Sequence, residues 1–179
     1  MTLNVFTHPI GNPTIDQTVL SFIRTFGNDL PMKVWEDGRN TTGLADGYIK
    51  AIKECKSDYL FMLEHDWEFI HRPEHSLKEI VKMMKEEGIV HLRFNKRKNE
   101  PVNMDKYLND KGWYCATPFV SNNPHIISRK AYLGFIEQGW IKNLSGSRGI
   151  EEELSNYITG AIYGGVGYRQ VVKHLKGGK

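Results

Sequence analysis

The sequence predicts an α/β fold in which a mixed, mainly parallel sheet is flanked by helices. Strand-like and helix-like segments alternate through the first half of the chain, and one predicted strand, Tyr59–Leu63, is apolar on both sides. Strands that alternate with helices pair in parallel through right-handed crossovers, and continuous apolarity suits a central strand that is covered on both faces. The chain has 179 residues, which is the size of one domain, so we expect a single domain over residues 1–179.

The first elements follow the order strand, helix, strand, helix. Short strands are expected at Leu3–Thr7 and Met32–Glu36. Between them, apolar residues recur at helical spacing over Ile15–Phe26, and Gly27 stands where this helix should end. A second helix is expected over Leu44–Cys55, again from one apolar face.

The same alternation continues through the central strand. After Tyr59–Leu63, Ser76 and Glu79 form a capping box that should begin a third helix. Gly88 stands where a glycine commonly ends a helix. The apolar stretch Ile89–Phe94 then predicts a fourth strand, parallel to the others.

The pattern is less regular after Phe94. Residues 95–113 are polar and basic and are expected to form a loop. The remaining predicted elements are a strand at His125–Ser128, a helix at Ser128–Gln138, a helix at Glu151–Ile158 and a last strand at Val166–Val172.

Composition and sequence pattern restrict the class of protein, although the formal charge does not identify a partner. A charge of +3 neither requires nor excludes a nucleic acid. There is no apolar run as long as a membrane span, and the N-terminus lacks the layout of a signal peptide. Cys55 and Cys115 stand alone, without a CxxC pair, which excludes a zinc ribbon. Two reduced thiols are typical of a cytoplasmic protein, and we expect that location.

Polar residues collect at the carboxyl ends of the first three strands. These are Thr7, His8 and Pro9 after the first, Glu36 and Asp37 after the second, and Glu64, His65 and Asp66 after the third. Ligands of open parallel sheets bind at this edge. Buried carboxylates need a metal ion, a cationic partner or solvent to offset their desolvation.

The acidic character of this edge restricts the ligand. The sequence has no GxGxxG motif and no Walker lysine loop, so a dinucleotide or P-loop site is not expected. Carboxylates can serve a nucleotide by accepting hydrogen bonds from its base or ribose. They can also hold a divalent cation that neutralises a diphosphate.

Five stretches of the chain, taken in order, resemble the GT-A glycosyltransferases, in particular the family-2-like group that uses nucleotide-diphosphate sugars. The stretches are "VFTHPIGNP", "VWEDGRN", "GLADGYIKAIKECKSDYLFMLEHDW", "GIEEELSNYI" and "VVKHL", and together they cover most of the chain. Glu64, His65 and Asp66 stand where the family has its DxD motif, so Glu replaces the first Asp. The chain is also shorter than most members, a size that resembles virus-encoded transferases.

The resemblance implies a GT-A (Rossmann-like) fold with a nucleotide-sugar-binding half, residues 1–94, and an acceptor or catalytic half, residues 95–179. It implies donor-binding roles for Thr7, Pro9, Asp37, Glu64 and Asp66. Asp66 would coordinate Mn²⁺ or Mg²⁺ at the donor diphosphate, and His174 would be a further metal ligand. The plainer alternatives are a turn residue for Asp37, because Asp-Gly is a common turn dipeptide, and a surface residue for His174.

The resemblance also places the catalytic base in the glutamate run Glu151, Glu152 and Glu153, with Glu152 favoured and Glu151 next. In an inverting transfer, a carboxylate takes the proton of the acceptor hydroxyl as the oxygen attacks the sugar. The alternative explanation for these glutamates is that negative charge stabilises a helix N-terminus.

The function implied is a metal-dependent, inverting glycosyltransferase with a UDP-sugar as the favoured donor and a hydroxyl acceptor. A modified base in DNA is one possible acceptor, and Asn95–Lys98 would then meet phosphate. A non-catalytic nucleotide- or sugar-binding module stays open as an alternative. A nucleotidyltransferase ranks lower, because the chain after the first strand lacks a glycine-rich basic loop.

Overall fold

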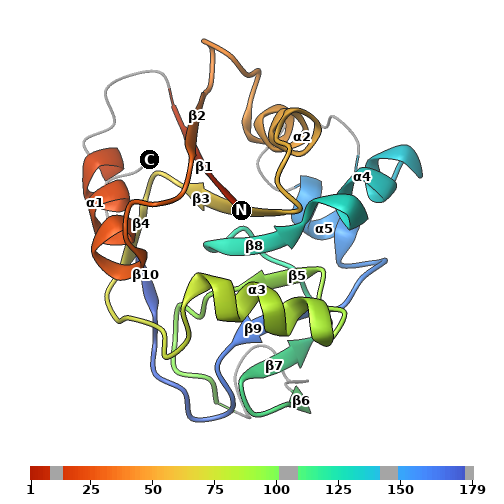
Figure 1. Ribbon diagram of the computed structural model, residues 1–179. Helices are drawn as coiled ribbons and strands as arrows, with labels where there is room; N and C mark the ends of the chain where they lie inside the picture. The colour runs from red at the N-terminus through yellow and green to blue at the C-terminus, as the bar shows by residue number, and fades with distance from the viewer. Residues whose placement is uncertain (9–13, 101–108, 142–148, 176–179) are drawn as a thin grey trace.

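The computed structural model describes residues 1–8, 14–100, 109–141 and 149–175 of the chain, apart from the side chains of Glu152 and Glu153. These residues form one large sheet, a small second sheet and five helices (Figure 1). The helices are α1 (Thr14–Phe26), α2 (Leu44–Glu54), α3 (Leu77–Glu86), α4 (Arg129–Glu137) and α5 (Gly149–Leu154).

The large sheet has eight strands in the order β2-β1-β3-β8-β5-β9-β7-β6. The strands are β1 (Thr2–Thr7), β2 (Met32–Glu36), β3 (Tyr59–Glu64), β5 (His91–Arg93), β6 (Asn109–Asp110), β7 (Tyr114–Thr117), β8 (His125–Ser128) and β9 (Gly160–Tyr163). The pairings give all of them one direction except β8 and β7, which run the opposite way. The predicted mixed, mainly parallel sheet flanked by helices is therefore confirmed.

The second sheet is a pair of short antiparallel strands, β4 (Trp67–Phe69) and β10 (Val172–His174). β4 follows β3 almost directly, whereas β10 comes from the C-terminal end of the described chain. Their register places His174 opposite Trp67. This pairing brings the end of the chain back to the carboxyl edge of β3.

The fourth predicted strand became β5 and runs parallel to β1, β2 and β3 as expected, although β8 lies between β5 and β3 and is antiparallel to both. The prediction about the last strand was wrong. The last strand was expected at Val166–Val172, but the chain forms turns there and β10 begins only at Val172. Gly167 in this segment has a positive φ angle of 88°, which is incompatible with a regular strand, and Gly164 just before it has a φ of 85°.

Each face of the large sheet has its own apolar core, because side chains alternate along the strands. On β3, Phe61 and Leu63 pack on the side of α1 and α3, whereas Leu60 and Met62 pack on the side of α2, α4 and α5. The view in Figure 1 shows helices on both sides of the sheet. A strand that is apolar on both sides was the signal that predicted this three-layer arrangement.

The strand β8 connects the two predicted halves of the chain, residues 1–94 and 95–179. It comes from the second half of the sequence, yet it pairs with β3 and β5 of the first half. The two halves thus share one sheet, and their separate roles in donor and acceptor binding stay a prediction.

The edge strand β2 ends in a tight turn. The backbone N–H groups of Asn40 and Thr41 donate to the Glu36 carbonyl, at 3.0 and 3.3 Å. The Asn40 side chain folds back along the strand, where its amide oxygen accepts from the Glu36 N–H at 2.7 Å and its amide nitrogen donates to the Val34 carbonyl at 3.2 Å. The turn thereby covers part of the outer edge of β2.

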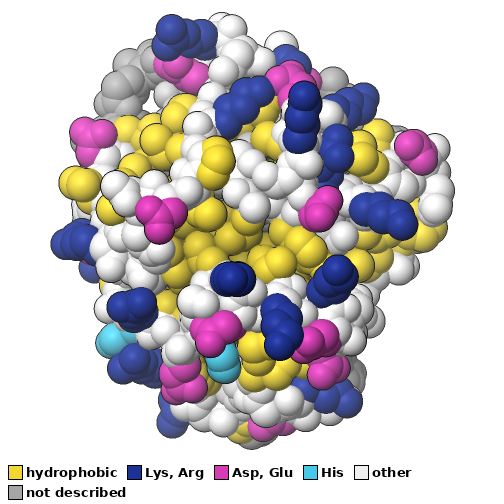
Figure 2. Space-filling view, viewed as in Figure 1, with side chains coloured by type: hydrophobic (Ala, Val, Ile, Leu, Met, Phe, Trp, Pro, Cys, Tyr) yellow, Lys and Arg dark blue, Asp and Glu magenta, His cyan; other side chains and the backbone are white. Residues whose placement is uncertain are grey.

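Hydrophobic side chains gather in the middle of the face shown in Figure 2, between α1, α3 and α4, and Lys and Arg side chains surround them. The exposed large apolar residues include Leu20 and Ile23 of α1 and Met32 and Val34 of β2. Exposed apolar side chains are common on soluble domains.

Candidate functional site

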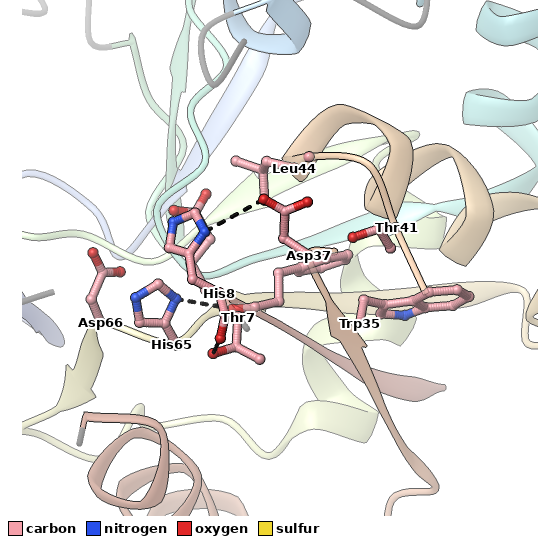
Figure 3. Close-up of a pocket in the computed structure, with 11 residues that line it drawn as sticks. Thr7, His8, Trp35, Asp37, Thr41, Leu44, His65 and Asp66 are labelled. Carbon is pink, nitrogen blue, oxygen red and sulfur yellow. Dashed lines mark hydrogen bonds and ion pairs between the residues drawn. The ribbon is translucent and has the colours of Figure 1, made fainter. Parts of the chain in front are cut away.

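A cavity of about 120 Å³ lies at the carboxyl ends of β1, β2 and β3 (Figure 3). This is the edge at which an open parallel sheet binds its ligands. The cavity is lined by Phe6, Thr7, His8, Trp35, Asp37, Thr41, Gly43, Leu44, Glu64, His65 and Asp66. Four of the predicted donor-binding residues, Thr7, Asp37, Glu64 and Asp66, therefore lie around one cavity.

The ends of β1 and β2 are tied together at one wall of the cavity. The Asp37 N–H donates to the Thr7 carbonyl at 2.9 Å, which extends the β1–β2 pairing past the last paired residues. Gly38 follows with a φ of 76°, a value that favours glycine. The chain turns there, and the Asp37 carboxylate is left at the cavity.

His8 lies between the two acidic corners of the cavity. Its Nδ1 is 3.7 Å from Oδ2 of Asp37, and its ring meets that of His65 edge-on, with centroids 5.3 Å apart. Figure 3 shows these two imidazoles between the Asp37 and Asp66 carboxylates. His8 is largely exposed, so its ring stands at the mouth of the cavity and not in its floor.

Glu64 is the last residue of β3 and continues the alternation of that strand. It follows Leu60 and Met62 on the side of α2, where the buried ring of Tyr48 stacks on Phe6 with centroids 4.4 Å apart. Burial, with the negative charges of Asp66 and Glu151, raises the pKa of Glu64 to about 8, against a smaller opposing effect of Tyr48. At neutral pH the carboxyl of Glu64 is thus largely protonated until a cation or another ligand compensates its burial.

Asp66 is the most tightly held carboxylate of the site. Its residue is 7% exposed, its backbone carbonyl accepts from the Leu175 N–H at 2.7 Å, and its Oδ2 lies 2.9 Å from Nε2 of His174. The other oxygen, Oδ1, is buried and has no hydrogen-bond partner among the described residues. A buried carboxylate oxygen without a partner costs free energy unless a ligand satisfies it.

The strand β10 explains how His174 reaches Asp66. Its pairing with β4 puts His174 beside Trp67. The two rings meet edge-on, with centroids 5.1 Å apart. Lys173, the neighbour of His174, forms an ion pair of 2.8 Å with Glu68 of β4. The predicted pairing of Asp66 with His174 is therefore present as a contact, although its role in metal binding stays a prediction.

The donor set of this corner fits a divalent cation that takes most of its ligands from elsewhere. Within the parts of the chain that the structure describes, no group of three or more His, Cys, Asp and Glu side chains could hold a metal. Asp66 and His174 supply two ligand atoms, one of them on a carboxylate with an unsatisfied oxygen. Mg²⁺ in phosphate-binding sites is commonly held by one or two protein ligands, with waters and substrate oxygens.

The helix α5 carries the glutamates that were predicted to include the base. Its residue Glu151 accepts a hydrogen bond through Oε1 from the Asn122 N–H, and its charge contributes to the pKa of Glu64. Glu151 therefore lies near the acidic corner, with one oxygen engaged by the backbone. The side chain of Glu152 and all of Pro9 lie outside the described residues, so their predicted roles stay predictions.

Several residues of the cavity carried no clear signal in the sequence. Thr41, Gly43 and Leu44 come from the loop before α2 and the start of that helix. His65, to which the sequence assigned no binding role, also lines the cavity, directly after β3 ends at Glu64. The turn-rich stretch between β2 and α2 was the one available hint that this loop bends over the sheet edge.

Comparison with solved structures identifies the fold. The chain aligns with the crystal structure of S. aureus TarS 1-349 in complex with UDP-GlcNAc, with a TM-score of 0.58 and 13% identity, over 98% of this chain and 59% of that one. It aligns with GalNAc-T7 with UDP, GalNAc and Mn2+, with a TM-score of 0.56 and 13% identity, over 95% of this chain and 44% of that one. No family model matches the sequence, and no curated protein is significantly similar to it.

The fold is that of GT-A-type glycosyltransferases. The chain spans about 60% or less of the length of these solved structures. Among the described residues, there is no helix with the length and apolarity needed to cross a membrane. The cytoplasmic location expected from the sequence stays a prediction.

Proposed function

We propose that the protein is a glycosyltransferase that moves a sugar from a nucleotide-diphosphate donor to a hydroxyl group of an acceptor. A UDP-sugar is the favoured donor. This proposal is supported by the fold, by a cavity at the carboxyl edge of the sheet, and by structural neighbours that were crystallised with UDP-GlcNAc or with UDP.

The observation that carries the proposal is the state of Asp66. This carboxylate is buried at the end of a central strand, contacts His174 through one oxygen and has no hydrogen-bond partner for the other among the described residues. It shares its cavity with Asp37 at the neighbouring strand end. An unsatisfied buried carboxylate beside a histidine suits a cation that a diphosphate brings with it.

Asp66 and His174 would hold Mn²⁺ or Mg²⁺, and GalNAc-T7, one of the structural neighbours, contains Mn2+. When bound, the cation would neutralise the negative charge that develops on the departing diphosphate. Both metals accept carboxylate oxygens, and Mn²⁺ also accepts imidazole nitrogen.

The other residues of the cavity would bind and orient the donor. Asp37 would accept hydrogen bonds from the base or ribose, Thr7 would line the nucleotide pocket through its backbone, and Glu64 would contact the ribose. Pro9 would extend this wall. These groups fix the anomeric carbon of the sugar relative to the acceptor, and such positioning is a large part of enzymatic rate enhancement.

In the inverting reaction that we propose, a carboxylate of α5, preferably Glu152 and otherwise Glu151, accepts the proton of the acceptor hydroxyl. The acceptor oxygen forms a bond to the anomeric carbon, and the bond from that carbon to the diphosphate oxygen breaks. Its electron pair leaves with the nucleoside diphosphate. The engagement of Glu151 by the Asn122 N–H favours Glu152 as the base.

Binding and turnover together test this function. Calorimetry with UDP and a panel of UDP-sugars should detect Mn²⁺-dependent binding that Asp66→Asn weakens about a hundredfold or more, because the uncharged amide cannot replace a carboxylate ligand. Asp58→Asn is the matched control, since Asp58 is exposed and precedes the other end of β3. Absence of binding for every nucleotide sugar, with and without Mn²⁺, would overturn the proposal.

Release of UDP from the preferred donor separates catalysis from simple binding. Glu152→Gln should keep donor affinity within about twofold while it lowers turnover by roughly a hundredfold to ten-thousandfold, the usual contribution of general-base catalysis. A non-catalytic binding module would bind the donor but would release no UDP in either form.

A further inference from the structure

Three loops that are distant in the sequence form one continuous surface on the side of the molecule where β10 begins. They are residues 70–76 before α3, residues 94–100 after β5, and residues 164–171 between β9 and β10 (Figure 1). Backbone hydrogen bonds join them: Ile70 N–H to the Val171 carbonyl at 2.9 Å, and Asn99 N–H to the Tyr168 carbonyl at 3.0 Å. We call this the basic loop surface.

The surface takes its name from its cations. Five exposed Lys and Arg residues lie on these loops: Arg72, Lys96, Arg97, Lys98 and Arg169. Glu74 and Glu100 are the exposed acids of the same segments. Formal charge on the surface is therefore positive, in a chain whose overall charge is only +3.

A buried amide fixes two of the loops that carry these cations. Asn95 is 3% exposed, and its Nδ2 donates to the carbonyls of Arg97 and Arg169, both at 2.8 Å. The Arg169 guanidinium in turn donates to the Arg72 carbonyl at 3.4 Å. The three arginine-bearing segments are thus held next to one another by hydrogen bonds that involve the backbone.

Holding like charges together in this way is unfavourable for the protein alone. The repulsion is modest in water, and it is opposed by the hydrogen bonds of the Asn95 amide and of the Arg169 guanidinium that hold the segments together. An anion offsets the repulsion, and guanidinium groups bind phosphate through paired hydrogen bonds. Several cations on adjacent braced loops suit a ligand that carries several phosphates in a row.

We propose that the basic loop surface binds the phosphodiester backbone of a nucleic-acid strand. The consequence for catalysis rests on the proposed function: the acceptor hydroxyl would then belong to a nucleic acid. The loop of residues 164–171 leads directly into β10, whose His174 contacts Asp66, so the basic loop surface is joined to the candidate site by one three-residue strand.

An anionic membrane is the other large partner with closely spaced phosphates, and the surface suits it less well. Proteins that lie on membranes combine cations with apolar side chains that enter the lipid. Among the described residues of these three loops, only Val166 is a large apolar residue with an exposed side chain. The other exposed large apolar residues of the described chain lie outside these loops, at Leu20, Ile23, Met32, Val34, Phe119 and Tyr157.

Salt-dependent binding of oligonucleotides tests the proposal. Fluorescence anisotropy with a labelled single strand and a labelled duplex, over about 50 to 300 mM salt, should give an association constant that falls linearly on logarithmic axes. The triple variant Arg72→Gln, Lys98→Gln, Arg169→Gln should bind about tenfold or more weakly at the lowest salt and should flatten the slope by about 2, because each lost phosphate contact contributes about 0.7 to 0.9.

A second triple variant provides the matched control. Lys53→Gln, Lys56→Gln and Lys130→Gln remove the same charge from exposed positions at α2 and α4, and binding should change less than twofold. Both variants should keep the melting temperature and the UDP affinity of the unmodified protein, which separates this test from the test of the donor site.

Three results would overturn the inference. They are an absence of oligonucleotide binding at the lowest salt, equal losses in the two triple variants, and vesicles of anionic phospholipid that bind as well as the oligonucleotide. If UDP-sugars also failed to bind, the donor site would be refuted independently.

Discussion

Two strands bring side chains to the same acidic corner, and they do so from very different surroundings. β3 lies within the large sheet, and Leu60, Phe61, Met62 and Leu63 are fully buried. β10 is a three-residue strand that pairs only with β4 among the described elements, and both Lys173 and His174 are exposed. From this difference we expect substitutions in β3 to lower the stability of the whole fold. Substitutions in β10 should remove the contact of His174 with Asp66 and leave the fold stable.

The largest loss of stability is expected when a substitution creates a cavity in the core around β3. Phe61 has no exposed surface and packs on the rings of Phe22 and Phe94, with centroids 4.9 and 5.6 Å away. Phe61→Ala should lower the free energy of unfolding by about 3–5 kcal/mol, as buried Phe to Ala changes do. Urea denaturation measures this loss.

The control for this variant is Met32→Ala on the edge strand β2, where the side chain is 51% exposed. It should change the free energy of unfolding by about 0.5 kcal/mol or less. A loss below about 1 kcal/mol for Phe61→Ala would contradict the view that the β3 core stabilises the whole fold.

The next largest effect is a dependence of folding stability on pH, and it arises from two buried histidines of β5 and β8. The imidazoles of His91 and His125 stack with centroids 4.6 Å apart. Burial lowers the pKa of His125 from 6.5 to about 4, against a smaller opposing effect of its hydrogen bond to the Asn123 carbonyl. Burial, with the charges of His125 and Arg93, also lowers the pKa of His91.

The sign of the pH dependence follows from these shifts. Above pH 6.5, the His125 imidazole is neutral in both the folded and the unfolded protein. As the pH falls from 6.5 towards 4, the unfolded chain binds a proton that the folded chain does not, so folding stability falls by about 1.4 kcal/mol per pH unit, or about 3 kcal/mol in all. His91 adds to this loss.

Urea denaturation between pH 7 and pH 4 measures the slope. His125→Asn is the matched variant, because its amide nitrogen can replace Nδ1 as the donor to the Asn123 carbonyl but does not titrate. Its stability should depend on pH less steeply by about one proton over this range. Equal slopes in the two proteins would show that His125 is not buried in its neutral form.

The smallest effect should be confined to the site. His174→Ala removes the contact with Asp66 from an exposed position and should weaken Mn²⁺-dependent donor binding by about tenfold to a hundredfold, the usual cost of losing a group that holds or orients a metal ligand. The free energy of unfolding should stay within about 0.5 kcal/mol of the original. Calorimetry and urea denaturation on the same samples give both quantities.

Lys173→Ala is the neighbouring control, because it removes an exposed ion pair with Glu68 and leaves His174 in place. Its donor affinity should be unchanged. If His174→Ala destabilised the protein as strongly as Phe61→Ala, the distinction between the two strands would fail.

The sequence was sufficient for the part of the cavity at the ends of β1, β2 and β3, because that part depends on local patterns. Three apolar strands, each followed by polar residues, predict that Thr7, Asp37 and Asp66 meet at one edge of a parallel sheet, and the structure places them around one cavity. This inference needs only hydrophobic periodicity and the crossover rule.

The pairing of distant segments could not be predicted in this way. The apolar stretch His125–Ser128 reads as a strand, but nothing within it indicates that it lies between β3 and β5. Val166, Val171 and Val172 suggest one strand, although the glycines at 164, 165 and 167 favour turns. The proximity of His174 to Asp66 was inferred from resemblance, since it depends on the β4–β10 pairing and not on local propensity.

The side chain of Asn40 has a consequence for how molecules of this protein meet one another. By bonding to the N–H of Glu36 and the carbonyl of Val34, it occupies groups that a strand from a second molecule would otherwise use. Exposed apolar residues Met32 and Val34 stand beside this edge, a combination that would otherwise invite intermolecular β-pairing and aggregation. One amide thus helps to keep an open sheet from growing outward.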